Sequence, residues 1–142
     1  MRHVAGYTIL NDVSARDAFV REGMEAPFTF DWLRQKGQAT SAPCGPWLLP
    51  ARDCPDPGDL AIALRLGGEV MQDSRTSQML FSIEEQIAFL SRILPLVPGD
   101  IISTGTCAGV GAARGRFLAP GDMMHAQIER IGVLSNPVEE AV

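Results

Sequence analysis

The sequence predicts an α+β domain that consists mostly of β-strands and is wrapped as a roll or barrel. The tripeptide Pro-Gly-Asp occurs three times, and an apolar run follows it each time. One segment alone combines a helix cap with helical periodicity, and the other apolar runs are short. The length of 142 residues is that of one domain with its own core, containing roughly six to eight strands.

The N-terminal third is expected to hold a strand, a short helix and long loops. Residues 4–10 are apolar and rich in β-formers, which indicates a strand. Ser14 can cap a short helix over residues 15–21. Residues 27–47 show no clean period and contain several glycines and prolines, which predicts an irregular connection. Residues 50–57 are expected to form another loop.

Each Pro-Gly-Asp is expected to form a type II turn, since proline presets φ and glycine accepts a positive φ. The turns occupy residues 57–59, 98–100 and 120–122. The strands expected after them are residues 60–66, which turn back at 67–68 into 69–72, then 101–103 and 123–128. The intervals between turns are unequal, which argues against a repeat protein.

The firm helix begins at Ser82. Ser82 and Glu85 have the spacing of a capping box, and Pro95 is expected to end the helix. Its apolar face is formed by Ile83, Ile87, Leu90 and Leu94.

Composition excludes several classes of protein. With 46% apolar and 20% charged residues the chain is not disordered. A net charge of -5 without a basic cluster argues against nucleic-acid and membrane-surface partners. No apolar run approaches the ~18 residues of a membrane span. Three cysteines without a C-x-x-C pair are typical of reduced thiols, so we expect a cytoplasmic protein.

Polar clusters mark three places for chemistry. Asp12 ends the first strand, and Arg16 can lie beside it; the alternative is an ion pair that braces a helix start. Lys36, the one lysine among 12 basic residues, is either an exposed loop residue or a proton-transfer group that arginine cannot replace. Thr106 lies in a small-residue loop, which is either an anion cradle or a tight turn. Cys107 beside it has no histidine placed by sequence to activate it as a nucleophile.

Together these segments resemble the C-terminal catalytic domain of the fumarylacetoacetate hydrolase family. The match is collinear over nearly the whole chain, so residues 1–142 are taken as one such domain. The matching stretches are residues 3–17, 36–37 with 43–47, 68–82, 98–106, and 120–122 with the tail 132–137.

The resemblance implies a mixed β-roll with peripheral helices, assembled as a homodimer. It implies a small-molecule substrate, a 2-oxo or 2-hydroxy-dienoic carboxylic acid of the kind met in aromatic breakdown, and a cofactor, Mg²⁺ or Mn²⁺. On the matching positions Asp12 would be a metal ligand and Lys36 the catalytic lysine. Arg16 and Thr106 would bind the substrate's carboxylate. A hard cation that prefers oxygen ligands suits such a chelating substrate.

The chain also departs from the family pattern. The family completes its metal site with a Glu-x-Glu pair upstream of the aspartate and uses a His and a Glu in an N-terminal lid, and neither feature occurs in this sequence. Phe19 replaces a common glutamine, and Cys107 replaces a proline. We therefore expect an incomplete metal site in this chain. A fragment, a mis-started reading frame and a natural short paralogue all remain open as explanations.

Two functions follow from these expectations. The first is a metal-dependent hydrolase, lyase or isomerase of 2-oxo acids, inactive as this chain if the missing carboxylates are decisive. The second is a non-catalytic β-roll, a degenerate paralogue that dimerises or binds a partner.

Overall fold

The computed structural model describes residues 2–18, 20–25 and 29–140. Phe19, singled out above, lies outside the described residues. The strands are β1 (Gly6–Leu10), β2 (Cys44–Pro50), β3 (Ala61–Leu66), β4 (Glu69–Arg75), β5 (Met123–Ile128) and β6 (Gly132–Pro137). The α-helices are α1 (Trp32–Lys36), α2 (Ile83–Leu90) and α3 (Gly111–Arg114), and short 3₁₀ turns occupy Ala51–Asp53 and Thr76–Gln78. The expected strand-rich α+β domain is confirmed.

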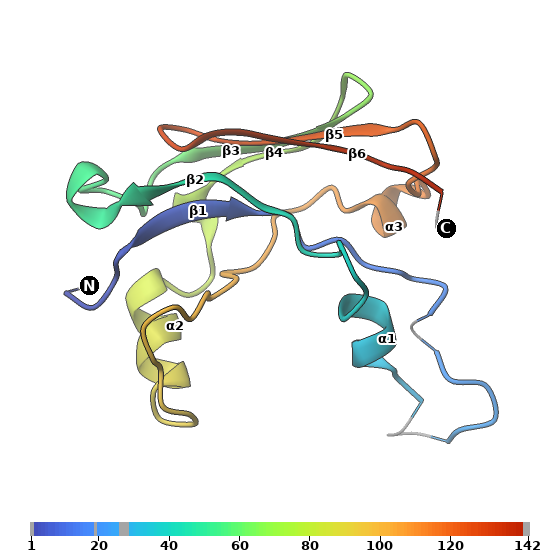
Figure 1. Ribbon diagram of the computed structural model, residues 1–142, viewed down its shortest axis with the longest axis horizontal. Helices are drawn as coiled ribbons and strands as arrows, with labels where there is room; N and C mark the ends of the chain where they lie inside the picture. Colours follow the sequence, from blue (N-terminus) through green and yellow to red (C-terminus); the bar gives the residue numbers. More distant parts are fainter. Residues whose placement is uncertain (1, 19, 26–28, 141–142) are drawn as a thin grey trace.

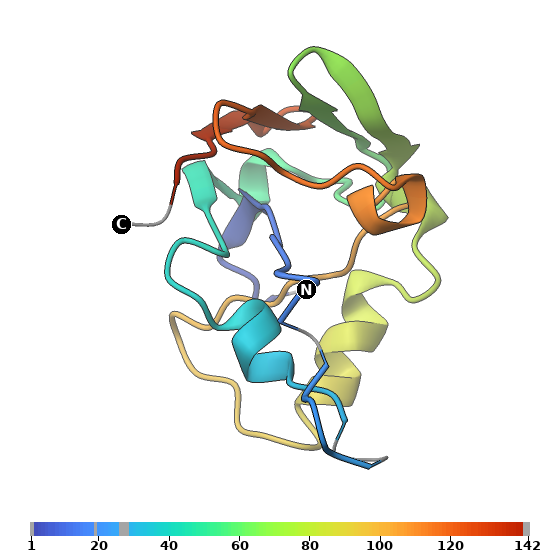
Figure 2. The same cartoon turned by 90° about the vertical axis from the view of Figure 1, so that its right-hand side faces the viewer.

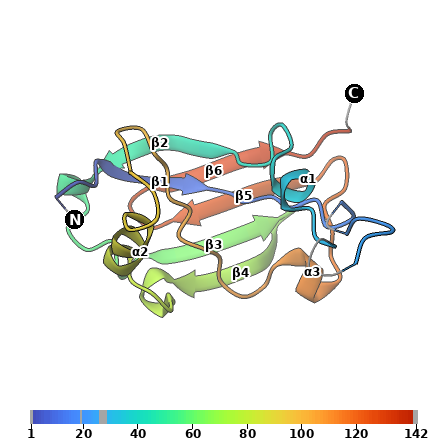
Figure 3. The same cartoon turned by 90° about the horizontal axis from the view of Figure 1, so that it is seen from below.

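Two antiparallel sheets form the body of the fold. β4, β3, β5 and β6 pair in that order, and β1 and β2 form a separate two-stranded ribbon. The ribbon lies below the larger sheet and contacts β5 and β6 (Figures 1 and 2). Seen from below, α2 lies at one end of the strands, and α1 and α3 lie at the other (Figure 3). The helices are therefore peripheral, as expected.

The core lies between the ribbon and the larger sheet. One buried cluster joins Ile9 of β1 to Ile131 and Leu134 at β6. A second joins Leu66, Met71 and Met124, which belong to β3, β4 and β5. Burial of the first cluster holds the two sheets together, and the second packs side chains of three neighbouring strands of the larger sheet.

The Pro-Gly-Asp turns follow the expected geometry at two of the three positions. Gly99 and Gly121 have φ of 103° and 92°, and Asp100 and Asp122 donate their amides back across the turns to Val97 and Ala119. Gly58 has no positive φ, so the first of the three is not a type II turn. The Gly58 amide instead donates to the side chain of Asp56, which stabilises another conformation.

The helix expected over residues 15–21 is wrong in the described part of that segment. Residues 16–18 form a bend and turn, closed by the Ala18 amide donating to the Ala15 carbonyl at 3.3 Å. The physical reason is pairing with another segment, because Val20 forms an antiparallel bridge with Phe30 and the Arg21 amide donates to the Thr29 carbonyl. Ser14 Oγ donates to the Asp12 carbonyl and caps no amide.

Two further expectations are also wrong. The segment 27–47, expected to be irregular, contains α1 and the start of β2, which were missed because α1 is only five residues long and β2 holds two prolines. Residues 101–103 form no strand, although they are apolar. This segment pairs with none of the described strands, and Ile101 stays 63% exposed. An apolar run does not by itself show that a segment pairs with a sheet.

The capping box of α2 is confirmed. Ser82 accepts from the Glu85 amide, and the Glu85 carboxylate accepts from the Ser82 amide. The helix ends at Leu90, one turn before Pro95. Within residues 2–18, 20–25 and 29–140, no helix has the length and apolar character needed to cross a membrane.

Candidate functional site

A cavity of about 230 Å³ lies between the larger sheet and the segments that follow β1 and precede α3. Its apolar wall comes from residues of β3, β4 and β5, including Leu64, Met71 and Met124. All four residues singled out from the sequence line it: Asp12, Arg16, Lys36 and Thr106. Segments far apart in the chain thus converge on one space, which is what a binding site requires.

The centre of the cluster is an ion pair between Lys36 and Asp12. Lys36 Nζ donates to Asp12 Oδ2 at 2.6 Å, and both side chains keep partial exposure, 33% and 47%. Asp12 follows β1 directly, and Lys36 is the last residue of α1. Ser41 Oγ donates to the Lys36 carbonyl at 2.7 Å, which holds the end of this short helix.

Positive charge dominates the rest of the lining. Arg16 lines the cavity and has no ion-pair partner among the residues that the structure describes. Arg116 also lines it, but its guanidinium donates to Asp122 at 2.6 Å. Asp12 neutralises the charge of Lys36, so the positive charge of Arg16 is left without a partner among the described residues. The cavity is therefore suited to an anion such as a carboxylate.

Gln72 of β4 also lines the cavity and was not singled out from the sequence, although it lies within the matching stretch 68–82. Its Nε2 contacts Thr106 Oγ1 at 2.9 Å and the Cys107 carbonyl at 2.7 Å. The sequence offered one signal, a polar amide next to the apolar Met71 within a predicted strand. Sequence alone does not reveal which loop such a residue faces.

Cys107 is not an activated nucleophile. Burial raises the pKa of its thiol, and the nearby Asp73 carboxylate adds to the effect. The thiol therefore stays protonated near neutral pH, whereas catalytic cysteines need a lowered pKa.

The described residues do not by themselves fit a divalent cation. Asp12 is the one carboxylate that lines the cavity, and it is engaged by Lys36. No group of three His, Cys, Asp or Glu side chains able to hold a metal occurs in residues 2–18, 20–25 and 29–140. Mg²⁺ takes near-octahedral oxygen coordination, which a single carboxylate does not provide.

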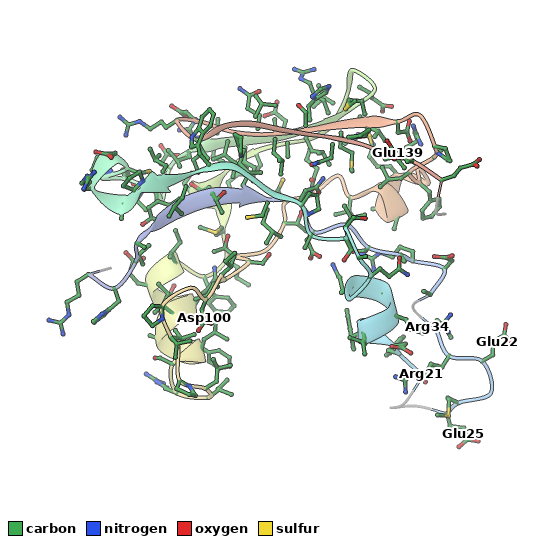
Figure 4. All side chains as sticks on the ribbon, viewed as in Figure 1. Arg21, Glu22, Glu25, Arg34, Asp100 and Glu139 are labelled. Carbon is green, nitrogen blue, oxygen red and sulfur yellow. The ribbon has the colours of Figure 1, made fainter. Side chains whose placement is uncertain are left out.

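The helix that carries Lys36 is fixed at its start by Asp31. Asp31 accepts from Arg21 Nε and from the Arg34 amide, each at 2.9 Å. The side chains of Arg21 and Arg34 both lie beside α1, and Glu22 and Glu25 lie farther out (Figure 4). The hydrogen bond from Arg21 holds the pKa of the Asp31 carboxyl below its ordinary value of 3.8.

Acid is therefore expected to loosen α1. A carboxyl whose folded-state pKa is depressed stabilises the fold above its unfolded pKa, and this contribution is lost as the pH falls through the folded value. Of the chain's two tryptophans, Trp32 lies in α1, so Trp47→Phe leaves it as the sole reporter. Its fluorescence should change below pH 3.8. Asp31→Asn still caps the helix but cannot titrate. An equal acid response in both proteins would exclude Asp31 as the cause.

Gln35 gives a second prediction for α1. Its side chain is fully buried, and neither Nε2 nor Oε1 has a hydrogen-bond partner in the described structure. Gln35→Met should raise the free energy of unfolding by about 1 kcal/mol, because it removes an unpaired buried amide at similar volume. Gln38→Met is the control, since Gln38 is exposed and donates to the Arg34 carbonyl. A loss of stability in Gln35→Met in urea unfolding would mean that the amide is satisfied.

Comparison with known proteins gives consistent matches. Residues 1–139 match the family "Fumarylacetoacetate (FAA) hydrolase C-terminal". The chain is 45% identical over 141 residues to the mitochondrial oxaloacetate tautomerase FAHD2A of Bos taurus, covering 97% of this chain and 43% of that protein. The chain thus spans less than half the length of that curated relative.

Solved structures agree in fold. A fumarylpyruvate hydrolase from Pseudomonas aeruginosa, in complex with Mn²⁺ and pyruvate, is similar with a TM-score of 0.85 and 34% identity, over 99% of this chain and 56% of that one. A 5-carboxymethyl-2-hydroxymuconate delta-isomerase from Mycobacterium smegmatis has a TM-score of 0.82 and 39% identity, over 97% of this chain and 49% of that one. The fold expected from the resemblance is confirmed, and the relatives are named enzymes.

Proposed function

Because the chain belongs to the fumarylacetoacetate hydrolase family, we propose that it forms the active site of an enzyme acting on small 2-oxo or 2-hydroxy-dienoic carboxylic acids. The observation that carries the proposal is the convergence of Asp12, Arg16, Lys36 and Thr106 on one cavity. The names of three similar proteins support the substrate class. Oxaloacetate, fumarylpyruvate and a hydroxymuconate are all carboxylic acids with a 2-oxo or 2-hydroxy group.

The three named reactions share one chemical demand. Tautomerisation, isomerisation and acylpyruvate hydrolysis all pass charge onto the 2-oxygen, next to a carboxylate, and all move a proton at carbon. Lys36 Nζ lies at the cavity in contact with Asp12 and can give or take that proton. Arg16 pairs with the substrate carboxylate, and the Thr106 hydroxyl donates to it.

A divalent cation, Mg²⁺ or Mn²⁺, remains part of the proposal. Among the described residues Asp12 is the one carboxylate at the cavity, so it is the candidate metal ligand that this part of the chain supplies. The Mn²⁺ in the similar hydrolase supports the class of metal.

Turnover of a small substrate panel tests the proposal. Oxaloacetate tautomerisation, fumarylpyruvate hydrolysis and hydroxymuconate isomerisation would be followed by absorbance, with Mn²⁺ present. Acceleration of one reaction by the chain, and its loss in Asp12→Asn, is the expected result. If none of the three reactions is accelerated, the second function, a non-catalytic β-roll, is favoured. The observation that supports this second function is that Asp12, the one carboxylate of the described residues at the cavity, is already paired with Lys36.

A homodimer is proposed as well, and α2 with the segments on either side of it offers the surface. These segments carry several exposed apolar side chains: Leu80, Phe81, Phe89, Ile93, Leu94, Val97 and Ile101. Exposed apolar surface of this kind often marks a protein–protein interface. Light scattering should give the mass of a dimer, which Phe89→Glu should lower to that of a monomer. Leu33→Glu, which changes an exposed leucine on α1, should leave the mass unchanged. A monodisperse wild-type monomer would contradict this prediction.

The cytoplasmic location expected from the three unpaired cysteines also stays a prediction.

A further inference from the structure

The amide of Gln72 makes two contacts whose chemistry fixes its orientation. Gln72 Nε2 lies 2.7 Å from the Cys107 carbonyl and 2.9 Å from Thr106 Oγ1. A carbonyl oxygen can only accept, so the group facing it must be the NH₂ and not the amide oxygen. The same NH₂ therefore donates to the Thr106 hydroxyl. The orientation of this amide follows from its partners and needs no visible hydrogens.

This donation directs the proton of the Thr106 hydroxyl away from Gln72, because the amide NH₂ cannot accept it. Thr106 is exposed and lines the cavity. Its one proton can therefore be offered to an acceptor in the cavity, such as a carboxylate oxygen.

We propose that Gln72 is a positioning residue that turns the proton of the Thr106 hydroxyl away from itself, so that this hydroxyl can donate to an anionic acceptor in the cavity. The proposal rests on the proposed function, because it assumes that Thr106 meets the substrate carboxylate. Gln72 touches no reacting atom and acts through Thr106 alone.

The rest of the loop supports a fixed geometry. Arg114 of α3 donates to the Val70 and Met71 carbonyls of β4 and pairs with Glu69 at 2.8 Å. Gly109 packs against the Met71 carbonyl so closely that an added Cβ would lie 2.0 Å from its oxygen. The part of the loop that follows Thr106 and Cys107 is thus also held against β4.

The experiment measures binding of pyruvate and of its neutral amide, pyruvamide, by calorimetry with Mn²⁺ present. Gln72→Met keeps the length of the side chain and removes the donor. It should weaken pyruvate binding about tenfold, because Thr106 no longer directs its hydrogen bond at the charged carboxylate, and it should weaken pyruvamide binding less, since a hydrogen bond to a neutral carbonyl is worth less. In a Thr106→Val background the same substitution should change the pyruvate Kd by less than about twofold, because the two effects are coupled.

Gln86→Met is the matched control. Gln86 also donates to a carbonyl, that of Phe81, but it does not line this cavity, so pyruvate binding should be unchanged. If wild-type chain binds pyruvate and Gln72→Met binds it equally well, or loses pyruvate and pyruvamide alike, the role of Gln72 is overturned and the proposed function stands. An equal loss in the Thr106→Val background also overturns it. If the wild-type chain binds no pyruvate, the proposed function fails, and the role of Gln72 fails with it.

Discussion

Lys36→Arg is expected to lower kcat by about 10²- to 10⁴-fold, the contribution that a general acid or base typically makes. Arginine keeps the positive charge and can still pair with Asp12, which Lys36 contacts at 2.6 Å. It cannot release a proton near neutral pH, so the ion pair survives and proton transfer does not. Steady-state kinetics on the substrate identified by the panel would measure the change, and urea unfolding should show nearly unchanged stability.

Arg34→Lys is the matched control for this substitution. It exchanges the same two side chains two residues away in α1, and Arg34 does not line the cavity. Its kcat should equal that of the wild type. Retention of more than about a tenth of the wild-type kcat by Lys36→Arg would remove Lys36 from the mechanism.

Gly109→Ala should be the most disruptive small substitution in the site. The added Cβ would lie 2.0 Å from the Met71 carbonyl oxygen, and Gly109 has a φ of 101°. Strain at such a φ costs about 1–3 kcal/mol, and the clash with rigid backbone adds roughly as much again. Since the loop must move away from β4, the contacts of Gln72 with Thr106 and Cys107 should also be lost. Urea unfolding and pyruvate calorimetry would measure both effects.

Gly99→Ala separates the strain from the clash. Gly99 has a φ of 103°, almost that of Gly109, but a Cβ there would meet nothing within 4 Å. Its loss of stability should therefore reflect the backbone strain alone, and it should leave pyruvate binding intact. Equal losses of stability in the two variants would mean that the loop is not packed against β4 as described.

Local signals in the sequence were sufficient for part of the fold. The capping box of α2 and the hairpin of β3 and β4 are specified by adjacent residues, and both formed as expected. The helix expected after Ser14 did not form because Val20 and Arg21 pair with residues 29–30, further along the chain. The short α1 depends on Asp31 and its contact with Arg21, and the periodicity of apolar residues in the sequence gives no sign of that contact.

The candidate site shows the same division between local and distant information. Asp12, Arg16, Lys36 and Thr106 were found because collinear motifs carry them, and the structure places all four at one cavity. Their chemical roles stay predictions. Gln72 was missed, because its importance lies in facing Thr106, 34 positions away, across a loop contact that neither alternation nor motif reveals.

We propose that this cavity binds a 2-oxo carboxylate and that Lys36 moves a proton at its neighbouring carbon. Exchange of the methyl protons of pyruvate for deuterium, followed by proton NMR in D₂O with Mg²⁺, tests this without requiring any bond between carbons to break. We expect the wild-type chain to speed the loss of the methyl signal, and we expect no acceleration with Lys36→Arg. Exchange at the rate of buffer alone with the wild-type chain, or equal acceleration by both proteins, would contradict it.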